Sequence, residues 1–203
     1  MNMKIFLALT LLAGAVQAQT VTGKAFGTYV NVAGVVSQSP VATLPSSGGM
    51  ATGQADAFSV AGVVAGERLN GVTTGAVDNQ KTGAQTTSEV ENVSAAGGAI
   101  TADIVTAVAT SYFGQTSAGR DATGSGFTNL VVNGVPVTTD VAPNTRVDLP
   151  GVGYAVLNEQ VPTGNDFTSW GITVNMVHVV LQNLFGMTTG EVIVGSASSS
   201  VSK

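Results

Sequence analysis

The chain has 203 residues, of which 44% are hydrophobic and 9% are charged, with a formal net charge of −5. One histidine and no cysteine exclude disulfides and the zinc sites that need several imidazole or thiolate ligands. The acidic balance disfavours nucleic acid and anionic membranes as partners, because both repel negative charge.

Residues 1–18 have the layout of a secretory signal peptide. Lys4 supplies the positive start, residues 5–16 the apolar run, and Val16 and Ala18 the small cleavage site. The run of about twelve residues is shorter than the roughly twenty that a membrane-spanning helix needs. We therefore expect a mature, secreted protein of residues 19–203, at the cell surface or in the extracellular space and not embedded in a membrane.

The first half of the mature chain alternates apolar runs with turn formers. We expect one or two strands at 21–36, a loop at 37–49, and a buried strand at 58–64. Asn70-Gly71 predicts a hairpin turn, because this dipeptide tolerates positive φ angles. The polar segment 75–89 is typical of strands with one solvated face, or of an excursion from the sheet.

The segment 100–113 follows a predicted turn at 95–98 and fits two interpretations. Ile100, Ile104, Ala107 and Val108 can form a helical stripe, but the β-branched content and Gly114 favour a strand. We expect a strand here and a loop at 117–126.

Residues 126–160 contain the clearest pattern, two successive β-hairpins. In the first, Asn133-Gly134 predicts a type I′ turn between strands at 127–132 and 135–139. In the second, strands at 146–149 and 154–158 flank the turn Pro150-Gly151-Val152-Gly153.

The segment 170–181 is the clearest single strand. We expect Trp170, Ile172, Val174, Met176, His178 and Val180 on one face, with Gly171, Thr173 and Asn175 opposite. A loop at 162–166 precedes it, and a loop or short helical turn at 182–189 leads to a closing strand at 191–197. Together these elements predict one all-β domain, an antiparallel β-sandwich of jelly-roll or Ig-like type.

A search for reactive groups predicts no catalytic, cofactor-binding or metal residue and no cofactor. The single histidine, His178, is expected as a core or core-edge residue hydrogen-bonded to a neighbour, and no G-x-S-x-G nucleophile motif occurs. Asp121 and Asn165-Asp166 are faint calcium candidates against the alternative of solvated turns. The carboxylates are scattered and suggest no hydrolytic pair.

Four segments resemble the bacterial choice-of-anchor P family. They are SEVENVSAAGGAITADIVTAVATSYF from Ser88, FTNLVVNGVPVTTDVAPNTRVDLPGVGYAVLNEQ from Phe127, GITVNMVHVVL from Gly171 and GEVIVGSASSSV from Gly190. The resemblance implies an exported surface or secreted domain of unknown activity. Relatives carry C-terminal anchoring signals, whereas this chain ends at Lys203 without a sorting motif, apolar tail or basic cluster.

Two functional hypotheses follow, together with a weaker third. The first is a non-enzymatic structural or adhesive β-domain of the bacterial cell surface or extracellular matrix, which assembles with itself through sheet edges, with segment 21–36 best placed for exchange. The second is a module that binds surface polysaccharide or another ligand, with stacking aromatics Trp170, Tyr154, Tyr112 or Tyr29. The third is a hydrolase with a carboxylate pair.

Overall fold

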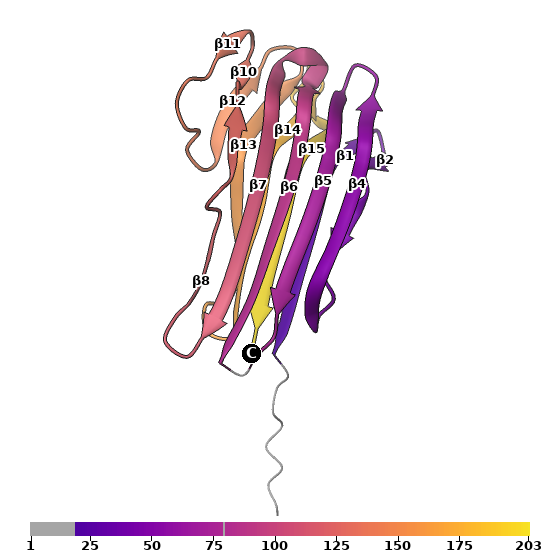
Figure 1. Ribbon diagram of the computed structural model, residues 1–203. Helices are drawn as coiled ribbons and strands as arrows, with labels where there is room; N and C mark the ends of the chain where they lie inside the picture. The colour runs from indigo at the N-terminus through magenta and orange to yellow at the C-terminus, as the bar shows by residue number, and fades with distance from the viewer. Residues whose placement is uncertain (1–18, 79) are drawn as a thin grey trace, which may run out of the picture.

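The computed structural model describes residues 19–78 and 80–203, so the expected signal peptide lies outside the described residues. Fifteen strands form two antiparallel sheets that pack face to face (Figure 1). The predicted all-β sandwich is confirmed. Among the described residues, no helix is long and apolar enough to cross a membrane.

The first sheet has seven strands, in the order β12-β13-β14-β15-β1-β2, with β3 also paired to β1. Its strands are β1 (Thr20–Val32), β2 (Val35–Gln38), β3 (Val41–Thr43), β12 (Thr145–Leu149), β13 (Gly153–Gly164), β14 (Ser169–Gln182) and β15 (Thr188–Ser202). The N-terminal strand β1 pairs with the C-terminal strand β15 from Thr20 opposite Ser202 to Val32 opposite Gly190. This pairing places β1 inside the sheet.

The second sheet has eight strands, in the order β11-β10-β7-β6-β5-β4, with β8 and β9 also paired to β7. Its strands are β4 (Gly48–Val60), β5 (Val64–Ala76), β6 (Lys81–Ala95), β7 (Ile100–Gly114), β8 (Ala118–Asp121), β9 (Gly126–Thr128), β10 (Val131–Val132) and β11 (Val135–Pro136). A short 3-10 turn, η1 (Ala96–Gly98), joins β6 to β7. Both sheets are therefore built mainly from consecutive hairpins.

The two hairpins predicted at 126–160 both form, but in different sheets. Asn133 and Gly134 have φ of 50° and 76°, as a type I′ turn requires, and connect the very short strands β10 and β11. In the second hairpin β12 pairs with β13, with Leu149 opposite Gly153. The chain therefore crosses from the second sheet to the first between these two turns.

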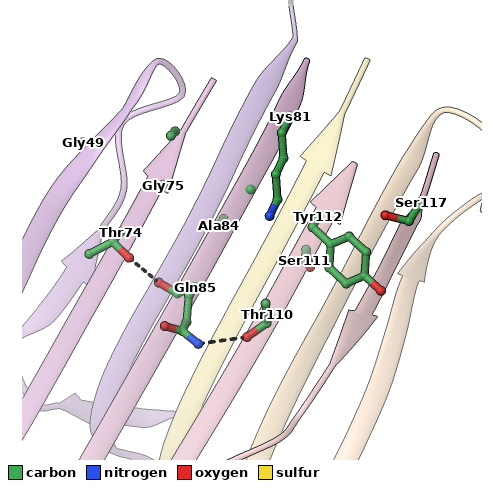
Figure 2. A pocket seen from close by; sticks show the side chains of 12 residues that line it. Gly49, Thr74, Gly75, Lys81, Ala84, Gln85, Thr110, Ser111, Tyr112 and Ser117 are labelled. Atoms are coloured by element: carbon green, nitrogen blue, oxygen red, sulfur yellow. Dashed lines mark hydrogen bonds between the residues drawn. The ribbon is translucent and has the colours of Figure 1, made fainter. Parts of the chain in front are cut away.

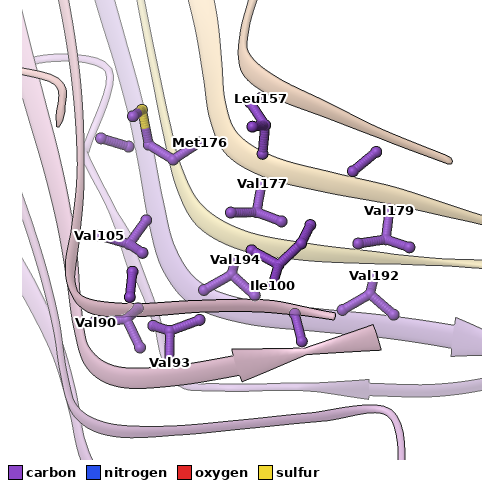
Figure 3. Close-up of a cluster of buried hydrophobic side chains, with 14 of the residues drawn as sticks. Val90, Val93, Ile100, Val105, Leu157, Met176, Val177, Val179, Val192 and Val194 are labelled. Carbon is purple, nitrogen blue, oxygen red and sulfur yellow. The ribbon is translucent and has the colours of Figure 1, made fainter. Parts of the chain in front are cut away.

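The core lies between the sheets and consists mostly of valine and alanine. Figure 3 shows Val90, Val93, Ile100 and Val105 of the second sheet facing the cluster from the first. The partners from the first sheet are Leu157, Met176, Val177, Val179, Val192 and Val194. Because the chain has no cysteine, this packing and the strand ladders hold the sandwich together.

In each sheet, neighbouring strands contain one residue at the same level that is skipped in the strand pairing. Beyond this level, the side chains that pointed inward and outward exchange faces. In the first sheet Asn158 and Gly195 have φ of 49° and 66°, and in the second Arg68 and Asn92 have φ of 44° and 49°. In β14, both Met176 and Val177 are buried as a result. Such local distortions bend a sheet and redirect side chains.

The shift corrects the predicted faces of β14. Ile172, Val174 and Met176 face the core as expected, but beyond the shift Val177 and Val179 do so instead of His178 and Val180. His178 therefore lies on the outer face. Both neighbouring ladders are interrupted at this level: Gly195 of β15 and Asn158 of β13 stand opposite Met176, and both have positive φ.

Several expected boundaries were wrong. Asn70-Gly71 is not a turn but lies inside β5, where Gly71 pairs with Gly53 and Ser88. The expected strand at 58–64 contains the hairpin turn between β4 and β5. The loops expected at 37–49 and 117–126 contain the short strands β3 and β8.

Three further bounds differ from expectation: β13 continues to Gly164 into the loop expected at 162–166, the closing strand expected at 191–197 is the longer β15, and the strands expected at 127–132 and 135–139 shrink to β9, β10 and β11. Segment 21–36 forms two strands, β1 and β2, and segment 75–89 contains the end of β5 and the first part of β6, whose burial alternates. Segment 100–113 is the strand β7. The expected loop at 182–189 is a tight hairpin in which the Asn183 side-chain oxygen accepts hydrogen bonds from the backbone N–H groups of Phe185 and Met187.

Candidate functional site

The edge strand β4 is the first candidate site. It has 13 residues and pairs only with β5 among the described strands, so it forms one side of the second sheet (Figure 1). Outside that ladder, the described backbone hydrogen bonds of β4 are turn contacts at its two ends, Gly48 N to Pro45 O and Val63 N to Val60 O. The opposite edge of β4 therefore presents unpaired N–H and C=O groups.

The composition of β4 offers little to block that edge. Its sequence, GGMATGQADAFSV, contains one charged residue, Asp56, and no proline or lysine. Natural edge strands are usually protected by charge, proline or shortness. The β4 edge lacks most of this protection.

Four other edge strands among the described residues are protected in those ways. β12 and β8 have five and four residues and carry Arg146, Asp148, Arg120 and Asp121. β11 has two residues, one of them Pro136. β2 has four residues. The long β4 edge stands out against all of these.

Exposed apolar side chains accompany this side of the sandwich. Met50 on β4 is 65% exposed, and Val35 and Val36 on β2 are 73% and 58% exposed. β2 and β4 end the two sheet orders and appear on the same side in Figure 1. Three exposed apolar side chains thus lie on the two strands that end the sheets on this side.

The second candidate site is a shallow groove of about 620 Å³ on the outer face of the second sheet, which we call the Tyr112 groove. It is lined by Gly49, Thr74, Gly75, Ala76, Lys81, Gly83, Ala84, Gln85, Thr110, Ser111, Tyr112 and Ser117. Figure 2 shows Tyr112 and Lys81 side by side over the strands. Three adjacent strands, β5, β6 and β7, supply most of the lining.

Gly119 on the neighbouring strand β8 gives the Tyr112 ring its position. Tyr112 stands opposite Gly83 on β6 and opposite Gly119 on β8. A Cβ atom at Gly119 would lie 2.9 Å from the Tyr112 hydroxyl oxygen and 3.1 Å from Cζ, so the ring lies over this glycine. One ring face thus packs over Gly119 on β8, and the opposite face is turned to the viewer in Figure 2.

Polar groups line the rest of the Tyr112 groove. The Gln85 side-chain N–H donates to Thr110 Oγ1 at 3.2 Å, and Thr74 Oγ1 donates to the backbone carbonyl oxygen of Gln85 at 3.5 Å (Figure 2). Lys81 has no carboxylate within ion-pairing distance in the described part of the chain. The groove thus combines one aromatic face, hydroxyl and amide groups, and one free cation.

The other aromatic candidates are less suited to stacking. Trp170 is 9% exposed and stacks on Phe113 with ring centroids 5.3 Å apart, so it belongs to the core. The Arg146 guanidinium covers the Tyr154 ring at 3.8 Å from its centroid. Tyr29 packs beside Phe26. Of the four predicted platforms, Tyr112 alone lines the groove.

The third candidate is a polar cluster on the outer face of the first sheet. His178 Nδ1 lies 3.0 Å from Glu159 Oε2, and His178 Nε2 lies 3.2 Å from Glu191 Oε2. Asn175 donates to Glu159 at 2.7 Å and accepts from Ser196 at 2.8 Å. The predicted hydrogen bond of His178 to a neighbour is confirmed, although its predicted face was wrong.

Two pKa shifts follow from this cluster. The hydrogen bond to Glu159 raises the pKa of His178 above its ordinary value, against the opposing effect of burial. The same bond lowers the pKa of Glu159, and the Asn175 bond adds to that effect. The pair is therefore a charged imidazolium and carboxylate over a wider pH range than the isolated groups. Neither residue lines a groove described above, so the cluster has the character of a structural ion pair.

The calcium candidates form ordinary turns. Asp121 Oδ1 accepts from the Thr123 N–H at 3.0 Å, and Asp166 pairs with Arg120 at 2.8 Å. Asn165 Oδ1 accepts from the N–H groups of Phe167, Thr168 and Ser169. Among the described residues, no group of three or more acidic, histidine or cysteine side chains is arranged to hold a metal.

Comparisons with known proteins give one match. The model of a family described as Domain of unknown function (DUF8256) matches residues 17–185. No curated protein and no solved structure matches the chain.

Proposed function

For this member of the DUF8256 family, we propose a secreted, non-enzymatic structural or adhesive β-domain that assembles with itself through β4. The observation that carries the proposal is the 13-residue β4 edge with a single charged side chain. A second copy is the occupant, because its own β4 offers an identical row of unpaired backbone groups and little charge to repel it.

The segment 21–36, which the sequence favours for exchange, is not suited to this role. β1 pairs with β15 on one side and with β2 and β3 on the other. Val21, Ala25 and Val30 are buried, so removing β1 would expose core residues and two ladders. Contact through β4 leaves the fold of each copy intact.

The register of the proposed contact follows from the bend in β4. The β4 ladder with β5 is continuous from Gly48 to Ala55 and then skips Asp56, opposite the positive-φ residue Arg68. Within it, the seven residues 49–55 are centred on Thr52. An antiparallel, two-fold contact centred there places Thr52 opposite Thr52 of the second copy and Met50 opposite Gln54. No two charged side chains oppose one another in this register.

Light scattering on the mature protein over about a hundredfold range of concentration tests the proposal, because mass action drives association. We expect the wild-type mass to rise with concentration. Thr52→Lys should remain monomeric, since two cations would face each other across the contact.

A matched control is available in the same sheet. Thr87 on β6 stands opposite Val72, which stands opposite Thr52, so all three share one row of the outer face. Thr87→Lys adds the same charge to a central strand and should associate like the wild type. A wild-type protein that stays monomeric at every concentration, or a Thr52→Lys variant that associates equally well, contradicts the proposal.

The cellular location is part of the same proposal. Lys4 and the apolar run at 5–16 support export. The resemblance to choice-of-anchor P proteins supports a place at the cell surface or in the extracellular matrix. The low content of charged residues, 9%, and the open β4 edge both favour association between copies. Such association is what a structural protein of the extracellular matrix requires.

A further inference from the structure

We infer that the Tyr112 groove binds a saccharide that carries a carboxylate, of the uronic acid class. The inference rests on the Tyr112 ring, on the hydroxyl and amide groups around it, and on the unpaired cation Lys81. It is independent of the proposed assembly through β4.

The ring provides the stacking surface. Tyr112 lines the groove, packs one ring face over Gly119 and has its other face turned away from the sheet in Figure 2. A flat aromatic face matches the C–H face of a pyranose ring, because both are apolar surfaces with polar groups at their rims. The groove is shallow and lies on a sheet face, which suits one or two units of an extended chain.

The rim supplies partners for sugar hydroxyls. Thr110 Oγ1 and the Gln85 amide already bond to each other at 3.2 Å, so their remaining donors and acceptors are held in place. Thr74 lies on the other side of Gln85. When a sugar binds here, its hydroxyl groups replace hydrogen bonds to water by hydrogen bonds to these side chains. The exchange therefore costs little free energy.

Lys81 favours a saccharide that carries a negative charge over a neutral one. Without a carboxylate partner among the described residues, its ammonium group is available to a ligand. Figure 2 shows its side chain extending along the groove beside Tyr112. The chain as a whole has a formal net charge of −5, which repels a carboxylate. The Lys81 ammonium group is a local positive charge and attracts a carboxylate to the groove.

Calorimetric titration of the mature protein with a galacturonic acid tetrasaccharide, and with a neutral glucose tetrasaccharide, tests the inference. We expect the acidic sugar to bind more tightly and to lose affinity as salt is added. Tyr112→Ala should weaken binding about tenfold or more, and Tyr112→Phe should retain most of it. Lys81→Gln should weaken the acidic sugar about two- to fivefold and leave the neutral one unchanged.

Tyr29→Ala is the matched control, because it removes a tyrosine from the opposite sheet and should leave binding unchanged. Performing the titration at both ends of the protein concentration range used for light scattering separates sugar binding from assembly. Equal affinity for the two tetrasaccharides, or acidic-sugar binding that survives in Lys81→Gln at full strength, overturns the assignment of a carboxylate ligand. An absence of binding to either sugar overturns the site itself.

Discussion

His178 Nδ1 lies 3.0 Å from Glu159 Oε2 on the outer face of the first sheet, at the point where the alternation of β14 has shifted. Both side chains are 19% exposed, so the pair is shielded from water on most sides. An ion pair in this position is stronger than one on the open surface, but its net effect depends on the cost of desolvation.

The pair makes stability depend on pH. The pKa of His178 is raised above 6.5, so its stabilising effect is complete below that value and is lost as pH rises through the folded pKa. The pKa of Glu159 is lowered below 4.5, so its effect is complete above that value and is lost as pH falls through the folded pKa. The contribution is therefore largest between these two ordinary values.

Replacing His178 tests this dependence. His178→Gln should lower the free energy of unfolding by about 1–3 kcal/mol at about pH 5.5, and by less at about pH 9. Urea denaturation at both pH values measures it. Asp148→Asn, which removes an exposed pair with Arg146 and leaves the Arg146–Tyr154 contact in place, should change stability little at either pH. An equal loss for His178→Gln at the two pH values would show that the pair is not the cause.

The turn at Asn133-Gly134 gives a second prediction. Gly134 has φ of 76°, and a Cβ atom at this position would have no neighbour within 4 Å, so any cost of a side chain there comes from the backbone. Gly134→Val should lower stability by about 1 kcal/mol or more. Gly126 has equally open space without a positive φ, so Gly126→Val is the control. Thermal melts that shift equally for both variants would contradict the type I′ assignment.

Gly195 gives a third prediction. Its φ is 66°, and a Cβ atom would lie 2.8 Å from Val105 Cγ1. Gly195→Ala therefore combines backbone strain with overpacking of the core, whereas Gly186→Ala at φ of 75° has open space and only the strain. We expect Gly195→Ala to be more destabilising by about 1–3 kcal/mol in denaturant titrations. Equal losses would mean that the core adjusts freely at the bend.

The N-terminus of the exported protein gives a fourth prediction. If residues 1–18 are removed on export, mass spectrometry of extracellular protein should find a start at Gln19 or within a few residues of it. An extracellular chain that retains Met1 would refute cleavage.

Local signals in the sequence were sufficient for some elements and not for others. The same dipeptide illustrates the difference, because Asn133-Gly134 forms a turn while Asn70-Gly71 does not. Gly71 instead lets the sheets approach, since a Cβ atom there would lie 3.2 Å from Ala25 Cβ. That requirement comes from a residue distant in the chain, and no local pattern reveals it.

The candidate sites depended on distant residues in the same way. The face of His178 depends on the shift that β14 shares with Asn158 and Gly195 on its two neighbouring strands. Tyr112 was among the aromatic candidates, but its ring position depends on Gly119 from the neighbouring strand β8. The β4 edge became visible only when β5 proved to be its one described partner, because strand order cannot be derived from alternation alone.

Self-assembly through β4 is tested most directly by a single-cysteine crosslink, which the absence of native cysteine makes unambiguous. In the proposed register the two Thr52 Cα atoms lie about 4.5–5.5 Å apart, within the range that a disulfide spans. Under mild oxidation Thr52→Cys should form a covalent dimer rapidly, and Thr87→Cys on the central strand β6 should not. A Thr52→Cys variant that crosslinks no faster than Thr87→Cys, at concentrations where the protein associates, would contradict pairing through β4.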